Sequence, residues 1–84
     1  MVERFVAEFA KLIATEPELI EVERRDIDKD FSEIIVYAGA QDVGKIIGKD
    51  GNMINSIKTV VSGCKAKDGI SYRILVKPLD ERAD

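Results

Sequence analysis

The segment at positions 31–38, which reads FSEIIVYA, constrains the fold more than any other part of this sequence. Its β-branched and aromatic residues are typical of a strand. A strand with one solvent-exposed face alternates apolar and polar residues, whereas the apolar residues here are nearly continuous. The chain has 84 residues, one cysteine and no histidine, so no disulfide framework or Cys/His metal site supplements the core. We therefore expect a strand that is buried on both sides or central in a sheet, stabilised by packing alone.

Periodic patterns before this segment predict a helix and then a strand. Six apolar residues recur at the three- and four-residue spacing of an amphipathic helix: Val2, Phe5, Val6, Phe9, Leu12 and Ile13. Pro17 limits this helix, because the residue before a proline is displaced from the helical region. Within residues 19–27, Ile20 and Val22 alternate with charged residues, which predicts a strand with one wet face. Residues 28–30 then have turn chemistry.

Two further helices are predicted after Gly39, which breaks the central strand. Gln41 or Asp42 is expected to cap a short helix that continues to Ile47. A second helix begins near Asn52 and has one apolar face, formed by Ile54, Ile57, Val60, Val61 and Cys64. Gly63 lies in this pattern and costs about 1 kcal/mol relative to alanine, which favours an early end of the helix.

The chain then turns at Asp68 and Gly69, and residues 70–76 alternate as a third strand that Pro78 closes. The predicted order is α-β-β-α-α-β, an α+β fold with three helices packed on one face of a three-stranded mixed sheet. The first two strands form an antiparallel hairpin, and a helical crossover makes the second and third strands parallel. We expect residues 1–78 to form one domain and residues 79–84 a loose polar tail.

Charge is distributed unevenly, although the net charge is only −3. Residues 1–42 carry five basic and eleven acidic side chains, a balance of −6, whereas residues 43–67 carry five lysines and one aspartate, a balance of +4. A basic segment on an acidic body attracts phosphate at one place and repels it elsewhere. Taken by itself, the pattern is explained more simply by lysines that solvate exposed helix faces.

Three glycines, Gly44, Gly48 and Gly51, lie within eight residues at the junction of the two later helices. Glycine permits dihedral angles that other residues avoid and lets another backbone approach closely. Because the loop ends where a helix begins, free N–H groups and the positive end of the helix dipole face outward and attract phosphate. Lys49 adds a charge at the tip of the loop, and Lys45 lies one turn earlier, within reach of a neighbouring phosphate.

Two other phosphate-binding loops do not fit. A Walker A loop needs four residues between its first glycine and the Gly-Lys pair, followed by Ser or Thr, whereas Gly44 and Gly48 are separated by three and Asp50 follows Lys49. The dinucleotide fingerprint GxGxxG also fails, since no glycine lies two positions before Gly48.

The segment Ile47-Gly48-Lys49-Asp50-Gly51, followed by Ile54, resembles the IGxxGxxI core of KH domains. The element order resembles the type II form seen in bacteria, and the chain up to Pro78 resembles small single-domain proteins of the KhpA type. This resemblance implies a groove that holds about four nucleotides of single-stranded RNA while the loop clamps their backbone.

Carried over residue by residue, the resemblance assigns the clamp to Gly48, Lys49, Asp50 and Gly51. It assigns a narrow apolar floor, against which the bases lie, to Val43, Gly44, Ile47 and Ile54. Core packing alone is an equal explanation for Ile47 and Ile54, and Lys45 is as readily solvated as bound to phosphate. The remaining lysines of the basic segment are interpreted as solubilising: Lys58, Lys65 and Lys67.

Two features differ from an ideal RNA-binding surface. Asp50 places a negative charge beside the phosphate path, although it can instead cap the second helix, and the acidic first half of the chain repels RNA outside the groove. Both features predict weak, salt-sensitive binding.

Other function classes are less well supported. The sequence offers no histidine and no recognisable set of nucleophile, base and oxyanion site, so we expect neither an enzyme nor a cofactor. The main alternative is a protein-interaction module, because resemblance to KhpA-type proteins implies a homodimer, or a heterodimer with a larger KH-containing protein. Two clamps on one strand then raise the effective affinity.

The N-terminus has no basic segment followed by an apolar stretch, and the most apolar window, residues 34–40, is far shorter than a membrane span. With one unpaired cysteine, this favours a cytoplasmic protein without membrane contact. The family resemblance further implies an RNA chaperone or post-transcriptional regulator linked to cell-wall synthesis and cell shape.

Overall fold

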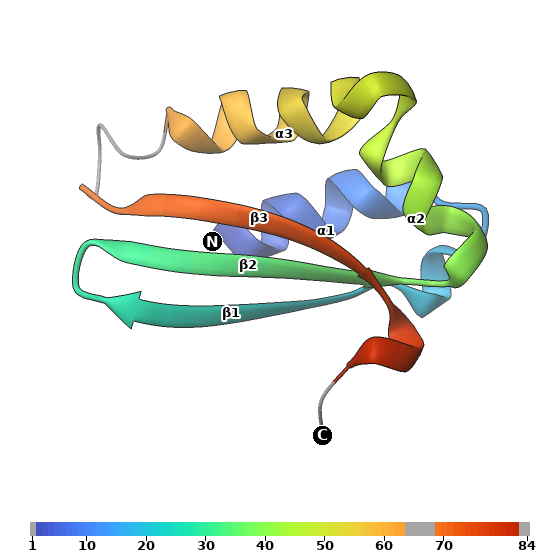
Figure 1. The fold of residues 1–84 in the computed structure, drawn as a ribbon, viewed down its shortest axis with the longest axis horizontal. Coiled ribbons are helices and arrows are strands. Elements are labelled where there is room, and N and C mark those ends of the chain that lie inside the picture. The colour runs from blue at the N-terminus through green and yellow to red at the C-terminus, as the bar shows by residue number, and fades with distance from the viewer. Residues whose placement is uncertain (1, 64–68, 83–84) are drawn as a thin grey trace.

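The computed structural model describes residues 2–63 and 69–82, and its elements follow the predicted order (Figure 1). Three short 3-10 turns, η1 (Pro17–Leu19), η2 (Lys49–Gly51) and η3 (Leu79–Glu81), lie between or after the main elements. The helices and strands are α1 (Val2–Ile13), β1 (Glu21–Asp28), β2 (Phe31–Ala38), α2 (Ala40–Ile47), α3 (Asn52–Ser62) and β3 (Ser71–Pro78). The predicted face of α3 included Cys64, which lies outside the described residues.

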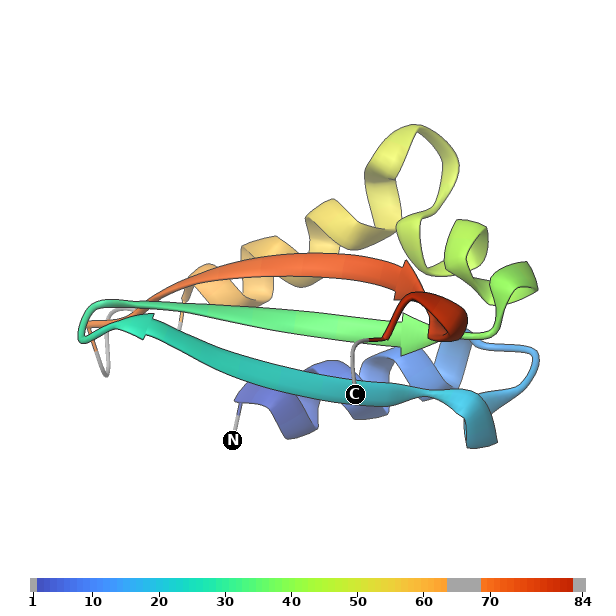
Figure 2. The same cartoon turned by 60° about the horizontal axis from the view of Figure 1, so that its bottom comes forward.

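The three strands form one mixed sheet in the order β1-β2-β3, which confirms the central position predicted for β2. β1 and β2 are antiparallel, with Val22 opposite Val36. β2 and β3 are parallel, with Val36 opposite Val76, because the two-helix crossover returns the chain to the same end of the sheet. Figure 2 shows the helices behind the sheet, on one face of it, as expected.

β2 is buried on both of its faces. Ile34, Val36 and Ala38 belong to the core cluster under the helices. Ile35 and Tyr37 point to the opposite face, because side chains alternate along a strand, yet each is only 1% exposed. In the described part of the chain no α-helix lies on this second face, but the segment after β3 does (Figure 2).

The C-terminal segment supplies part of this cover. We expected residues 79–84 to be a loose tail, whereas Leu79–Glu81 form the turn η3, on the sheet face opposite the helices (Figure 2). Arg82 then pairs with Glu21 and lies over the ring of Tyr37, with 5.5 Å between guanidinium carbon and ring centroid. These contacts are the physical reason for the difference, and the domain limit at residue 78 stays a prediction.

The start of α2 also differs from the prediction. The helix begins at Ala40, its N-cap is Gly39, and no side chain caps it. Asp42 lies inside the helix and is fully buried. Its carboxylate accepts hydrogen bonds from the backbone N–H groups of Thr15 and Glu16, each at 2.9 Å. The predicted capping role is therefore wrong, because Asp42 binds the segment after α1 instead of its own helix.

These hydrogen bonds predict an acid-sensitive fold. The N–H groups of Thr15 and Glu16 favour the ionised carboxylate and hold the pKa of Asp42 below its usual range. The pKa of an aspartate in the unfolded chain is about 3.9. A carboxyl whose pKa is lower in the folded state stabilises the fold at pH values above this unfolded pKa, and this stabilisation is lost as the pH falls through the folded-state pKa. The free energy of unfolding, measured by urea titration, should therefore fall below about pH 4.

In the variant Asp42→Asn, the free energy of unfolding should fall less steeply with decreasing pH than in the wild type, and it should be lower at pH 7. The control Asp80→Asn removes one negative charge at an exposed position and keeps Asp42, so it should retain the wild-type acid dependence. An Asp42→Asn variant with the wild-type acid dependence would contradict this account.

Candidate nucleic-acid interface

The loop between α2 and α3 depends on a close contact between Gly48 and Met53. Gly48 ends α2 with φ 80° and ψ 171°, and its N–H donates to the Gly44 carbonyl at 2.8 Å. A Cβ at Gly48 would lie 2.6 Å from the Met53 Cβ and 2.7 Å from the Met53 backbone nitrogen. Both the backbone conformation and this contact with the first turn of α3 therefore require glycine.

The rest of the loop continues with left-handed backbone. Asp50 has φ 56° and Gly51 has φ 76°, and Gly51 is the N-cap of α3. Asp50 therefore does not cap α3 as proposed from the sequence. It precedes the capping position and is exposed, so its negative charge stays at the loop surface.

Two backbone N–H groups of the loop are left without a backbone acceptor. Gly51 N–H donates to the Gly48 carbonyl at 3.1 Å, and Asn52 N–H donates to the Lys49 carbonyl. Within the described part of the chain, no backbone carbonyl accepts from the N–H groups of Lys49 and Asp50. The loop thus presents two adjacent N–H donors close to the start of a helix, an arrangement that binds anions.

The lysines of the basic segment take different positions. Lys49 is exposed on the loop and forms no ion pair with the residues that the structure describes. The Lys45 ammonium is also exposed but donates to the hydroxyl of Thr15, so it is directed toward the segment after α1. Lys58 lies exposed on α3, whereas Lys65 and Lys67 fall outside the described residues.

The expected apolar floor is divided between core and surface. Ile54 belongs to the buried core cluster, while Val43 and Ile47 are partly buried and pack against it. Gly44 is exposed on α2, and a Cβ added there would meet no atom within 4 Å. The structure thus places Val43, Gly44 and Ile47 along the same short helix that leads into the loop.

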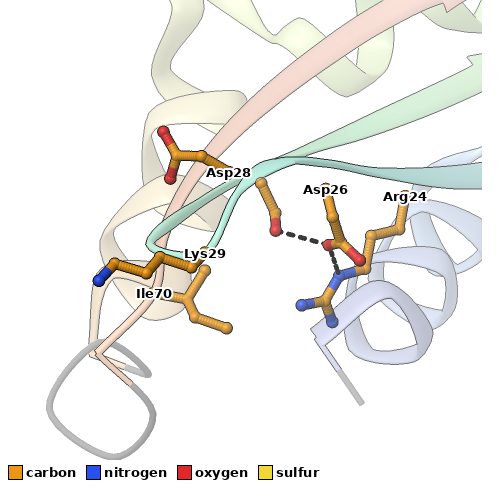
Figure 3. A pocket seen from close by; sticks show the side chains of 6 residues that line it. Arg24, Asp26, Asp28, Lys29 and Ile70 are labelled. Carbon is orange, nitrogen blue, oxygen red and sulfur yellow. Dashed lines mark hydrogen bonds and ion pairs between the residues drawn. The ribbon is translucent and has the colours of Figure 1, made fainter.

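A separate cavity lies at the far end of the β1–β2 hairpin, and Figure 3 shows its lining. Arg24 Nε and Ser32 Oγ both donate to Asp26 Oδ1, at 2.9 and 2.7 Å, and these two contacts lower the pKa of Asp26. The Arg24 guanidinium also lies 5.4 Å from the centre of the Tyr72 ring. Because these charges bind one another, we interpret the cluster as a structural contact at the edge of the sheet.

The role of Asp42 and the contacts of Thr15 were not predicted from the sequence. The signal was weak, since an aspartate near a helix start is the common pattern of a cap. The hydrogen-bond partners of the Asp42 carboxylate are the N–H groups of Thr15 and Glu16, which lie more than 25 residues earlier and come close to Asp42 only in the folded chain.

The fold and the loop together define a class of protein. An α-β-β-α-α-β chain, with its sheet covered on one face by helices and a GxxG loop joining α2 to α3, is a type II KH domain. A family model described as "KhpA/KhpB, KH domain" matches residues 3–76, and the chain belongs to this family. No curated protein matches the chain.

KH domains are a nucleic-acid-binding, non-enzymatic class, and membership supports RNA binding by this chain. Among residues 2–63 and 69–82, no group of three or more His, Cys, Asp or Glu side chains is arranged to hold a metal ion. No helix within the same residues has the length and apolar character that crossing a membrane requires.

The loop geometry predicts that its two glycines tolerate substitution differently. Gly51→Ala places a side chain at positive φ with adequate space, so it should lower the free energy of unfolding by about 1–2 kcal/mol. Gly48→Ala adds the clash with Met53 to a backbone conformation, φ 80° and ψ 171°, that is essentially confined to glycine, so for both reasons it should cost more than Gly51→Ala. Urea unfolding of both variants measures the difference, and equal costs would contradict the close contact between Gly48 and Met53.

Proposed function

We propose that this chain binds single-stranded RNA, with the loop Gly48-Lys49-Asp50-Gly51 clamping the sugar-phosphate backbone. The observation that carries the proposal is the pair of N–H groups of Lys49 and Asp50, which lie between two glycines and have no backbone acceptor among the described residues. The exposed Lys49 ammonium adds a charge-assisted contact to the same phosphate. The KH family match supports this assignment.

The bases are proposed to lie against α2 and the start of α3. Val43, Gly44 and Ile47 supply the accessible part of this surface, and Ile54 supports it from the core. A KH module holds about four nucleotides in this way. The exposed Gly44 matters most here, because a missing side chain allows a base or sugar to approach the helix backbone.

Binding by one module is proposed to be weak and sensitive to salt. The described part of α2, the loop and α3 carries Lys45, Lys49 and Lys58 against Asp42 and Asp50, while most carboxylates lie in the first half of the chain. Few phosphates are neutralised, so the affinity is modest. The surrounding negative charge restricts the strand to this surface.

In the cell, we propose a cytoplasmic RNA chaperone or post-transcriptional regulator linked to cell-wall synthesis and cell shape, acting without enzymatic activity or cofactor. The support for this role is membership of the KhpA/KhpB family. A strand held by a few weak contacts binds and dissociates readily, which suits a protein that acts on RNA structure transiently.

A second candidate function is pairing, with a second copy or with a larger KH-containing protein. The observation that favours it is exposed apolar surface: Leu12 on α1 is 87% exposed and Val60 on α3 is 55% exposed. Phe5 is also exposed on α1, whereas Val2, Val6 and Ala10 of that helix are buried in the core. Light scattering after size exclusion tests for a homodimer, and the same measurement with the partner present tests for a heterodimer.

Lys49→Asp should abolish RNA binding without unfolding the protein. The variant places two adjacent carboxylates in the loop, where they repel phosphate. Lys29→Asp is the matched control, since it makes the same change of charge in the turn between β1 and β2 and should bind like the wild type. Titration with labelled single-stranded oligo-RNA at low salt measures both variants, and an unchanged affinity of Lys49→Asp would remove the clamp from the proposal.

A bulky residue at Gly44 should separate folding from binding. Because Gly44 lies inside a helix with open space beside it, Gly44→Leu should unfold no more easily than the wild type and should gain about 0.5–1 kcal/mol of helix propensity. RNA affinity should nevertheless fall by at least tenfold, because the side chain occupies the place of the nucleotide.

The control for this variant is Ala40→Leu, at an exposed position in the first turn of α2, which should leave RNA binding unchanged. An NMR titration of both proteins with short single-stranded RNA maps the contacts. Shifts confined to the outer face of the sheet, with none between residues 43 and 54, would favour the interaction module over the RNA clamp.

A further inference from the structure

Three side chains of α2 bind Thr15 and Glu16, which lie two and three residues after the end of α1. Asp42 accepts the N–H groups of Thr15 and Glu16 at 2.9 Å, one with each carboxylate oxygen. Lys45 Nζ donates to the hydroxyl oxygen of Thr15, and Gln41 Nε2 donates to the Glu16 carboxylate. The N-terminal part of α2 is thus attached to a segment outside the helix-loop-helix.

These contacts fix the place of the Lys45 charge. A lysine side chain on a helix leans toward the helix N-terminus, and here Thr15 holds its end. An ammonium group has three N–H donors, so one bond to Thr15 leaves two for an anion. Both residues are exposed, and Lys45 lies four residues before Lys49, in the helix that leads into the loop.

Asp42 in turn fixes Thr15. The buried carboxylate accepts the Thr15 backbone N–H, and the Thr15 hydroxyl accepts from Lys45, so the three residues form one network. The N–H groups of Thr15 and Glu16 are the main cause of the lowered pKa of Asp42, and the Thr15 hydroxyl and the Lys45 charge lower it further. Holding a flexible lysine in one place before the ligand arrives reduces the entropy that binding costs. A lysine that only solvates a helix face has no hydrogen-bond partner that holds its ammonium group in place.

We propose that Thr15 is a positioning residue of the nucleic-acid interface, holding the Lys45 ammonium for the phosphate next to the one bound by the Gly48–Gly51 loop. The interface then extends beyond α2, the loop and α3 to the segment after α1. Glu16 and Glu18 follow Thr15 and repel phosphate, so the strand ends or turns away at this point. This inference rests on the proposed RNA-binding function.

The test is a double-mutant cycle of Thr15→Val and Lys45→Ala, with single-stranded oligo-RNA as the probe. Each single variant should weaken binding on the order of threefold to tenfold, as expected for one lost phosphate contact. In the Lys45→Ala background, Thr15→Val should have no further effect, because Thr15 acts only through Lys45. Thr15→Ser keeps the hydroxyl and should bind like the wild type.

The salt dependence gives a readout that a purely structural role would not change. Loss of one phosphate contact reduces the slope of log K against log salt by about 0.7 for a single strand. Thr15→Val removes no charge, so its slope decreases only if Lys45 leaves the phosphate. Thr59→Val is the matched control, since the exposed Thr59 hydroxyl donates to the Asn55 carbonyl within α3, and its slope should equal that of the wild type.

The outcomes separate this inference from the function on which it rests. If the wild type binds no single-stranded RNA, the proposed function fails and this inference with it. If the wild type binds and Lys49→Asp abolishes binding, but Thr15→Val keeps the wild-type slope, only the role of Thr15 is overturned. Additive effects of Thr15→Val and Lys45→Ala on the RNA affinity would also overturn the role of Thr15. Thermal unfolding of each variant verifies that the fold is intact.

Discussion

The burial of both faces of β2 is the constraint on which the rest of this structure depends. An 84-residue chain without a disulfide framework has few ways to exclude water from a continuous apolar strand. Here Ile34 and Val36 pack in the core cluster on one face, while Ile35 and Tyr37 are buried on the other, where Arg82 lies over the Tyr37 ring. With β1 and β3 on either side of it, β2 determines where the crossover helices α2 and α3 must lie.

The chain must turn from α2 into α3 within a few residues, and this turn creates the candidate site. Gly48 brings the chain against Met53, and the left-handed residues Asp50 and Gly51 turn it into α3. A turn this tight leaves the N–H groups of Lys49 and Asp50 without backbone acceptors in the described chain. The loop is therefore both a requirement of the fold and a set of donors for an anion.

α2 has two different functions on its two sides. One side carries Asp42 and Ile46, which are buried, and the carboxylate of Asp42 attaches the helix to the segment after α1. The other side carries the exposed Gly44, where the absence of a side chain has no explanation in the contacts of the chain itself. A helix of eight residues is too short to be stable alone, so its attachment through Asp42 also determines how firmly the loop is held.

The sequence by itself determined the element order, the central position of β2 and the identity of the glycine loop, because these depend on local periodicity and on backbone freedom that only glycine has. Tertiary structure alone decided the partners of Asp42, the contact between Lys45 and Thr15, and the fold of residues 79–82 against the sheet. Each of these joins residues distant in the chain, and a polar side chain in a sequence does not reveal which distant group satisfies it. Local pattern therefore predicts elements, whereas the pairing of buried and charged groups follows from how those elements pack.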